Sequence, residues 1–282
     1  MALQIATSPA DATVKVDPSG YQELESKIET LVAQNHGQIG VVYYDLTTGE
    51  SISVHGGLLF NPASVIKVPV MVEVYKRVAL GQLSLDNTRL SIKKKDRIWG
   101  SGQLYYEPLG KTYTIRQLVE VMITHSDNTA TKMLIDYLGP RNINQTMRSL
   151  GLRNTIIGNS DLLNADGLNF STPADMALLM RKLYAGEIFS PRFSQEMIQI
   201  MTRQTHKWGI PRFLPSNIRI ANKTGSLTGI KNDVGIVYYN DEPYVLSIFT
   251  NMRSDEQAKL LLRTLSKEIF KWKTAEDNGV AP

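Results

Sequence analysis

The chain has 282 residues, of which 42% are hydrophobic and 21% are charged, with a formal net charge of +4 and no cysteine. This composition fits one large globular unit and argues against a disordered chain or a fibre. The absence of cysteine excludes disulfides, thiolate catalysis and cysteine-ligated zinc.

The N-terminal part is predicted to contain a flexible arm, a helix and a hairpin. Residues 1–20 are rich in Ala, Ser, Pro, Thr and Asp, which is typical of a mobile arm. Leu24, Ile28, Leu31 and Val32 recur at helical spacing, which predicts an amphipathic helix over residues 21–34. Residues 39–46 and 51–55 flank a Thr-Thr-Gly turn and predict a β-hairpin.

The middle of the chain is predicted to be mostly helical. Residues 64–80 are largely apolar and indicate a buried helix, in which Pro69 is tolerated because it lies near the start. Residues 86–110 show no regular pattern. Further helices are expected from Thr114 onward, over residues 128–138, from Thr172-Pro173 to Tyr184, and over residues 194–205.

Towards the C-terminus the pattern returns to strands. Residues 218–223, 233–239 and 244–250 are short, β-branched and aromatic, and residues 254–272 predict a closing helix. We therefore expect an α+β fold, in which an antiparallel sheet is flanked by terminal helices and an all-helical lobe is inserted. The predicted α/β lobe comprises residues 21–59 and 216–282, the helical lobe residues 60–215, and the active site lies between them.

Ser64 and Lys67 form the first chemical motif, a serine and a lysine one helical turn apart. A serine hydroxyl needs a base, and a buried lysine with a lowered pKa can serve as one. The spacing alone is weak evidence, since Ser91 and Lys94 show it inside a charged run. Asn61-Pro62-Ala63 favours Ser64, because it predicts an abrupt entry into a helix, whose amino end stabilises negative charge.

Two further sequence motifs complete the pattern. Ser126-Asp127-Asn128 lies between two predicted helices, where it is either part of a site or a helix N-cap. Lys223-Thr224-Gly225-Ser226 ends a predicted strand, where it is either a carboxylate-binding segment or a surface turn. Gly225 would permit a ligand to approach the backbone closely.

Together and in this order, the three motifs resemble those of the penicilloyl serine transferases, in particular class A β-lactamases. The resemblance spans nearly the whole chain, from Tyr21 to Trp272. It implies that Ser64 is acylated by a β-lactam, that Lys67 handles protons, and that Ser126 relays a proton to the leaving nitrogen. It also implies an oxyanion hole formed by the backbone N–H groups of Ser64 and of Ser226 or Leu227.

The resemblance further implies a substrate-binding set. Asn128 would bind the amide side chain of the substrate, and Lys223, Thr224 and Ser226 would engage its carboxylate. The same resemblance also places Lys223 among the catalytic residues.

The pattern breaks at the loop that carries the deacylation base. Class A enzymes have Glu-x-x-Leu-Asn there, whereas this chain has Ser160 at the position of the glutamate and ends the motif with Leu163-Asn164. Asp161 and Asp166 are nearby carboxylates, but a loop aspartate or a helix cap is the simpler interpretation of each. Acylation is therefore expected, and efficient deacylation is not.

The expected partner is a small β-lactam or acyl-peptide substrate, with no nucleic acid, no membrane span, no metal and no other cofactor. The run Lys93-Lys94-Lys95 is interpreted as a solvated surface, and the four histidines lack metal-ligand spacing. A monomer and an exported location are expected, the latter from the resemblance. The alternatives are a penicillin-binding or D,D-peptidase-like protein, an esterase or amidase, and a non-catalytic protein that binds cell-wall ligands.

Overall fold

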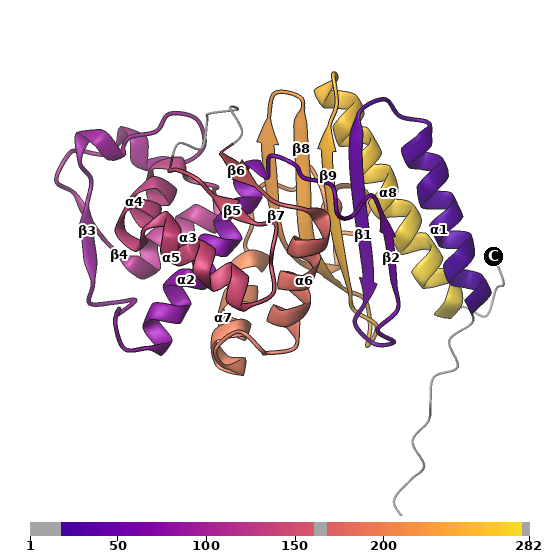
Figure 1. The fold of residues 1–282 in the computed structure, drawn as a ribbon, viewed down its shortest axis with the longest axis horizontal. Coiled ribbons are helices and arrows are strands. Elements are labelled where there is room, and N and C mark those ends of the chain that lie inside the picture. Colours follow the sequence, from indigo (N-terminus) through magenta and orange to yellow (C-terminus); the bar gives the residue numbers. More distant parts are fainter. Residues whose placement is uncertain (1–17, 161–167, 278–282) are drawn as a thin grey trace, which may run out of the picture.

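A computed structural model describes residues 18–160 and 168–277, so most of the predicted N-terminal arm lies outside the described residues. Its centre is a five-stranded antiparallel sheet with the strand order β2-β1-β9-β8-β7 (Figure 1). The strands are β1 (Gln38–Asp45), β2 (Ser51–Val54), β7 (Arg219–Leu227), β8 (Ile230–Tyr238) and β9 (Tyr244–Asn251). The predicted hairpin and the predicted C-terminal strands thus join in one sheet.

Helices from the two ends of the described chain cover one face of this sheet. They are α1 (Pro18–Ala33) and α8 (Asp255–Asp277), which lie side by side in Figure 1. The helical spacing of Leu24 and Ile28 turns both side chains inward, where they join a buried cluster with Leu262 and Leu265 of α8.

The opposite face of the sheet is covered by the helices of the middle of the chain. Helix α6 packs against β1, β8 and β9, and α2 lies in the centre of the remaining helices. Nine of the 13 residues of α2 are buried, including the charged Lys67 and Glu73. The helices are α2 (Lys67–Ala79), α3 (Ile115–Thr124), α4 (Asn128–Leu138), α5 (Pro140–Ser149), α6 (Pro173–Tyr184) and α7 (Pro191–Thr202).

Several short elements in the same region have no counterpart among the sequence predictions, except that η1 forms the start of the helix expected over residues 64–80. Each has only two to four residues, which is too short for a periodic pattern to mark. They are the paired strands β3 (Arg89–Ser91) and β4 (Thr112–Thr114), the paired strands β5 (Ile156–Ile157) and β6 (Asn169–Phe170), and the 3₁₀ helices η1 (Ala63–Ile66), η2 (Lys94–Asp96), η3 (Leu104–Tyr106) and η4 (Ile210–Phe213).

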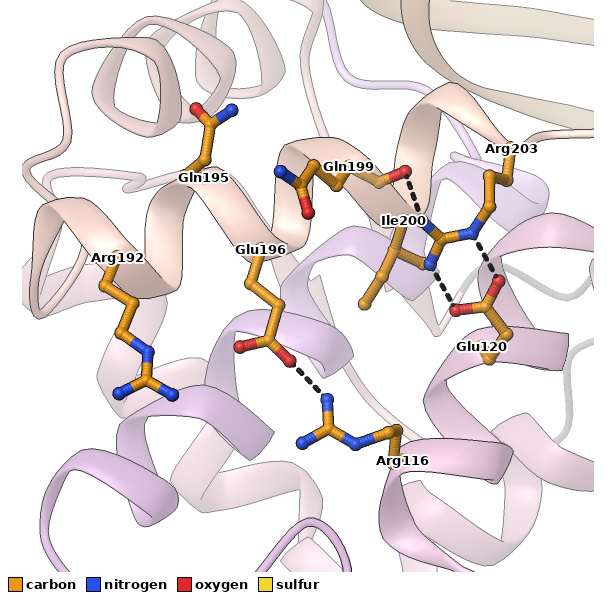
Figure 2. A pocket seen from close by; sticks show the side chains of 8 residues that line it. All are labelled: Arg116, Glu120, Arg192, Gln195, Glu196, Gln199, Ile200 and Arg203. Carbon is orange, nitrogen blue, oxygen red and sulfur yellow. Dashed lines mark hydrogen bonds and ion pairs between the residues drawn. The ribbon is translucent and has the colours of Figure 1, made fainter.

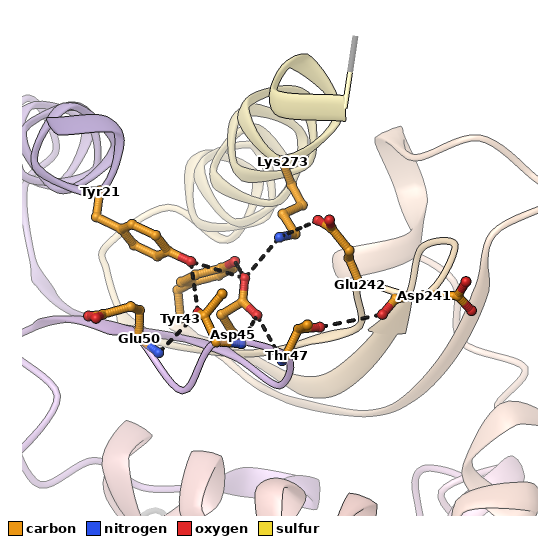
Figure 3. Close-up of polar contacts among 9 residues, drawn as sticks. Tyr21, Tyr43, Asp45, Thr47, Glu50, Asp241, Glu242 and Lys273 are labelled. Carbon is orange, nitrogen blue, oxygen red and sulfur yellow. Dashed lines mark hydrogen bonds and ion pairs between the residues drawn. The ribbon is translucent and has the colours of Figure 1, made fainter. Parts of the chain in front are cut away.

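The buried carboxylate of Asp45 ties the end of β1 to both terminal helices (Figure 3). Its Oδ2 atom accepts hydrogen bonds from the hydroxyls of Tyr21 and Tyr43 and lies 2.9 Å from Lys273 Nζ. Burial would raise the pKa of Asp45, but the backbone N–H of Thr48 and the Lys273 ammonium outweigh it and hold that pKa below its usual value. The cluster therefore contains a charged carboxylate at neutral pH.

Within residues 18–160 and 168–277, no helix combines the length and the apolar character that crossing a membrane requires.

Candidate active site

Ser64 lies in the 3₁₀ helix η1, directly before α2, and its side chain is half-buried. The preceding residue, Ala63, has a φ of +47°, which is uncommon for a residue with a side chain and marks a strained turn. The Asn61 carboxamide accepts a hydrogen bond from the Ala63 N–H at 2.9 Å and so supports this turn. The abrupt helix entry expected from residues 61–63 is therefore present, although it begins as a 3₁₀ turn.

Lys67 is the first residue of α2 and is fully buried. Its Nζ atom lies 3.0 Å from Ser64 Oγ, 2.9 Å from Ser126 Oγ and 2.8 Å from Asn128 Oδ1. Burial lowers the pKa of Lys67 well below its ordinary value, and the nearby Lys223 lowers it further. A neutral amine at this point can take a proton from Ser64.

The Ser126-Asp127-Asn128 segment joins α3 to α4, and its three side chains have different hydrogen-bond partners. Ser126 has a φ of +55° and turns its hydroxyl towards Lys67. Asp127 caps α4 through the Ala130 N–H and accepts the N–H groups of Gln103 and Leu104. The helix-cap interpretation therefore holds for Asp127.

Asn128 links this segment to the neighbouring loop. Its carboxamide accepts from Lys67 and donates to the carbonyl of Trp99 at 3.2 Å, and the Trp99 side chain is 66% exposed. Asn128 thus holds the backbone of the loop that carries Trp99.

Lys223 is fully buried in β7, and its Nζ atom lies 3.1 Å from Ser126 Oγ. Burial lowers the pKa of Lys223 to about 7, while the carboxylate of Asp233 acts in the opposite direction. Asp233 is itself buried on the adjacent strand β8, and burial raises its pKa to about 7. The hydroxyl of Ser126 therefore lies within hydrogen-bonding distance of the amines of Lys67 and Lys223. Burial favours the neutral form of both amines.

Gly225 packs against the chain that carries Ser64. A Cβ atom at this glycine would lie 2.5 Å from the carbonyl oxygen of Pro62 and 3.1 Å from the backbone nitrogens of Ser64 and Val65. Gly225 is thus needed for the close contact between β7 and η1. On either side of it, Thr224 is buried and Ser226 is exposed.

Ser160, at the position of the missing glutamate, accepts a hydrogen bond from Lys132 Nζ at 2.9 Å. Lys132 lies on α4 one turn after Asn128 and is also 3.0 Å from Asp136. Asp161, Asn164 and Asp166 lie outside the described residues. In the part of the chain that the structure describes, no carboxylate forms an ion pair or hydrogen bond with Lys67.

The spacing of Ser91 and Lys94 is accidental, because Ser91 belongs to β3 and Lys94 to η2.

Two residues that the sequence analysis did not single out contact the backbone directly before Ser126. The backbone N–H and the hydroxyl of Thr205 both donate to the carbonyl of Thr124, at 3.0 and 2.8 Å. The His206 Nε2 atom lies 3.3 Å from the carbonyl of His125, directly before Ser126. We call residues 205 and 206 the Thr205–His206 clamp. Its contacts join segments 81 residues apart, so no local pattern could have predicted them.

Burial also lowers the pKa of His206, and Lys223 and Lys67 contribute in the same direction. A neutral imidazole at this position adds no further positive charge beside the two lysines.

The chain is similar to known proteins over most of its length. The model of the beta-lactamase enzyme family matches residues 23–272. Beta-lactamase ROB-1 of Haemophilus influenzae is 28% identical, and the alignment covers 94% of this chain and 90% of that protein. Beta-lactamase BRO-1 of Moraxella catarrhalis is 26% identical, with 79% and 75% covered.

Solved structures show the same likeness. PBP-A superposes with a TM-score of 0.85 at 32% identity, covering 89% of this chain and 96% of PBP-A, and a single-residue variant of PBP-A has been observed as an acyl-enzyme complex with penicillin G. A beta-lactamase from Sphaerobacter thermophilus superposes with a TM-score of 0.81 at 29% identity, covering 95% of this chain and all of that one.

Proposed function

This chain belongs to the beta-lactamase enzyme family, and from that premise we propose that it opens β-lactam rings through an acyl-enzyme on Ser64. The protein is a serine β-lactamase-like hydrolase. The observation that carries the proposed mechanism is the position of Lys67 Nζ, within hydrogen-bonding distance of both Ser64 Oγ and Ser126 Oγ.

In the proposed acylation, neutral Lys67 removes the proton of Ser64 Oγ while that oxygen attacks the lactam carbonyl carbon. The negative charge on the carbonyl oxygen is stabilised by backbone N–H groups of Ser64 and of Ser226 or Leu227. When the carbon–nitrogen bond breaks, Ser126 gives its proton to the nitrogen and regains one from the Lys67 ammonium. The products of this step are an ester on Ser64 and a neutral Lys67.

Substrate binding is assigned to residues of the same site. We propose that Lys223, Thr224 and Ser226 hold the substrate carboxylate and that Asn128 binds its amide side chain. The cationic form of Lys223 is favoured by a bound carboxylate, because an opposite charge offsets the cost of burial. Gly225 contributes by bringing β7 against η1.

A second candidate function is a penicillin-binding protein whose acyl-enzyme persists. Ser160 has no acidic group, and its hydroxyl is hydrogen-bonded to Lys132. The structural likeness to PBP-A favours the same candidate. In this case Lys67 would have to activate the hydrolytic water as well, and deacylation would be slow.

Intact-protein mass spectrometry after mixing with penicillin G tests the proposal. We expect an increase in mass by one penicillin within the first turnover, none in Ser64→Ala, and slow return of the free mass. A Ser91→Ala variant is the matched control, because Ser91 has the same sequence spacing to a lysine but lies in β3. Wild-type protein that gains no mass would contradict acylation, and complete persistence of the adduct would select the second candidate.

We also propose an extracytoplasmic location, on the family resemblance alone. Fractionation of cells that express the natural gene tests it, and recovery of the protein only from the cytoplasm would contradict it.

A further inference from the structure

We propose that a surface pocket between the end of α7, η4 and the start of β7 binds a ligand that carries a phosphate-type oxyanion. The pocket has a volume of about 400 Å³. Its polar lining consists of Thr202, Lys207, Arg212, Ser216 and Arg219, and the rest is aliphatic or proline. We call it the basic pocket.

The basic pocket combines three cations with no lining carboxylate. Lys207, Arg212 and Arg219 are all exposed. Among the residues that the structure describes, none of the three forms an ion pair. Arg219 stacks over the ring of Tyr238 at 4.5 Å, an interaction that leaves its charge uncompensated. Three like charges around one concave surface repel each other, and a bound anion would relieve that repulsion.

A second pocket, between α3 and α7, contains arginines that are paired with carboxylates (Figure 2). Arg116 is paired with Glu196, and Arg203 lies 2.6 Å from Glu120 across the two helices. Two of its three arginines are therefore neutralised by carboxylates of the same pocket. The basic pocket has no such internal counter-ions, so its charge is available to a ligand.

The chemistry of the three cations favours an oxyanion with more than one negative charge. A guanidinium offers two parallel N–H donors, which match the oxygens of a phosphate group, and two guanidinium groups are present. The hydroxyl of Ser216 adds a neutral donor. Although Lys207 is exposed at the surface, partial burial lowers its pKa, and the charge of Asp233 acts in the opposite direction. A bound oxyanion would also favour the charged form of Lys207.

The basic pocket is separate from the site around Ser64. Arg219 and Lys223 are four residues apart on β7, which places their backbones about 13 Å apart. Anion binding at the two places can therefore be distinguished by which residues respond.

An NMR titration of the ¹⁵N-labelled full chain with pyrophosphate at low ionic strength tests the proposal. We expect saturable shifts of amides in residues 207–219, and a dissociation constant about tenfold weaker in Arg212→Gln, which loses a charge-assisted contact. Arg212 has no ion pair among the described residues, so this variant should fold. Arg192→Gln is the matched control. Among the described residues, Arg192 of the other pocket forms no ion pair, and its loss should leave the affinity unchanged.

Vesicles with and without phosphatidylglycerol distinguish a soluble phosphate ligand from a lipid headgroup. Loss of pyrophosphate binding in Arg212→Gln supports a soluble ligand, and loss of vesicle co-sedimentation in the same variant supports a headgroup. The proposal is overturned if neither probe binds, if Arg212→Gln binds both as the wild type does, or if shifts occur only around residues 223–226. Each of these outcomes is independent of β-lactam acylation.

Discussion

The Nζ atom of Lys67 lies 3.0 Å from the Oγ atom of Ser64, and the amine is fully buried. If Lys67 is the acylation base, Lys67→Met should slow acylation by penicillin about 10²- to 10⁴-fold, the usual contribution of a general base. Stopped-flow or quenched mass spectrometry measures this rate. Lys76→Met is the control, because Lys76 lies on the same helix but bonds Thr146. Near-normal acylation in Lys67→Met would remove Lys67 from this role.

The pH dependence of acylation should have two limbs. The rate rises with pH as Lys67 loses its proton, at a pKa below the ordinary lysine value. It should fall again as Lys223, with a pKa of about 7, loses the charge that we propose binds the substrate carboxylate. The measurement is the second-order acylation constant between pH 5 and pH 10. Lys223→Arg stays charged over this range and should move the alkaline limb upward. An unmoved limb would exclude Lys223 as its source.

Ser160→Glu should shorten the life of the acyl-enzyme. The change supplies a carboxylate at the position where Lys132 now bonds a hydroxyl, and a positioned base typically accelerates water attack by at least about 100-fold. The decay of the penicillin adduct is followed by mass spectrometry. Ser160→Gln is the control of equal size without a charge, and equal decay in both variants would show that this position does not reach the reacting water.

The Thr205–His206 clamp should affect catalysis more than stability. His206→Ala removes the contact with the carbonyl that precedes Ser126, so we expect acylation about tenfold slower, equivalent to a loss of about 1.4 kcal/mol, from a less well-positioned Ser126. The melting temperature should change by only a few degrees. His36→Ala is a control on a distant surface. Unchanged acylation, or a loss explained fully by unfolding, would contradict a positioning role.

Asp45→Asn should destabilise the protein without affecting its chemistry. It deprives the buried ammonium of Lys273 of the Asp45 carboxylate, while Glu242 remains paired with it, and breaking a buried pair typically costs about 3 kcal/mol or more. Tyr21→Phe removes one hydrogen bond to Asp45 and a contact with the Thr48 hydroxyl but leaves the Asp45–Lys273 pair intact, and should cost about 1 kcal/mol. Urea unfolding measures both. Equal losses, or a reduced acylation rate per folded molecule, would contradict this assignment.

The elements that were predicted well are those with a strong local pattern. Helix α4 has the predicted bounds, because Asp127 caps its start and Gly139 ends it. Helix α5 was not predicted. Pro140 was interpreted only as the end of the preceding helix, whereas it occupies the first turn of the next one, where a missing N–H costs nothing.

The candidate site was only partly predictable for a similar reason. The spacing of Ser64 and Lys67 is local, so one helical turn predicted that they face each other. The convergence of Lys223 on Ser126 depends on how β7 packs against the helices, and the sequence order of the motifs indicated it only through the family resemblance. The packing role of Gly225 and the contacts of Asp127 depend on neighbours distant in sequence, which no spacing rule reports.

The contact between Gly225 and the Ser64 backbone has a consequence for protein engineering. A methyl group at residue 225 would force apart the strand that carries Lys223 and the turn that carries Ser64, so these two proposed site residues cannot be adjusted independently there. Directed evolution of this protein should therefore begin at exposed positions such as Trp99 and Ser226, and leave this junction unchanged.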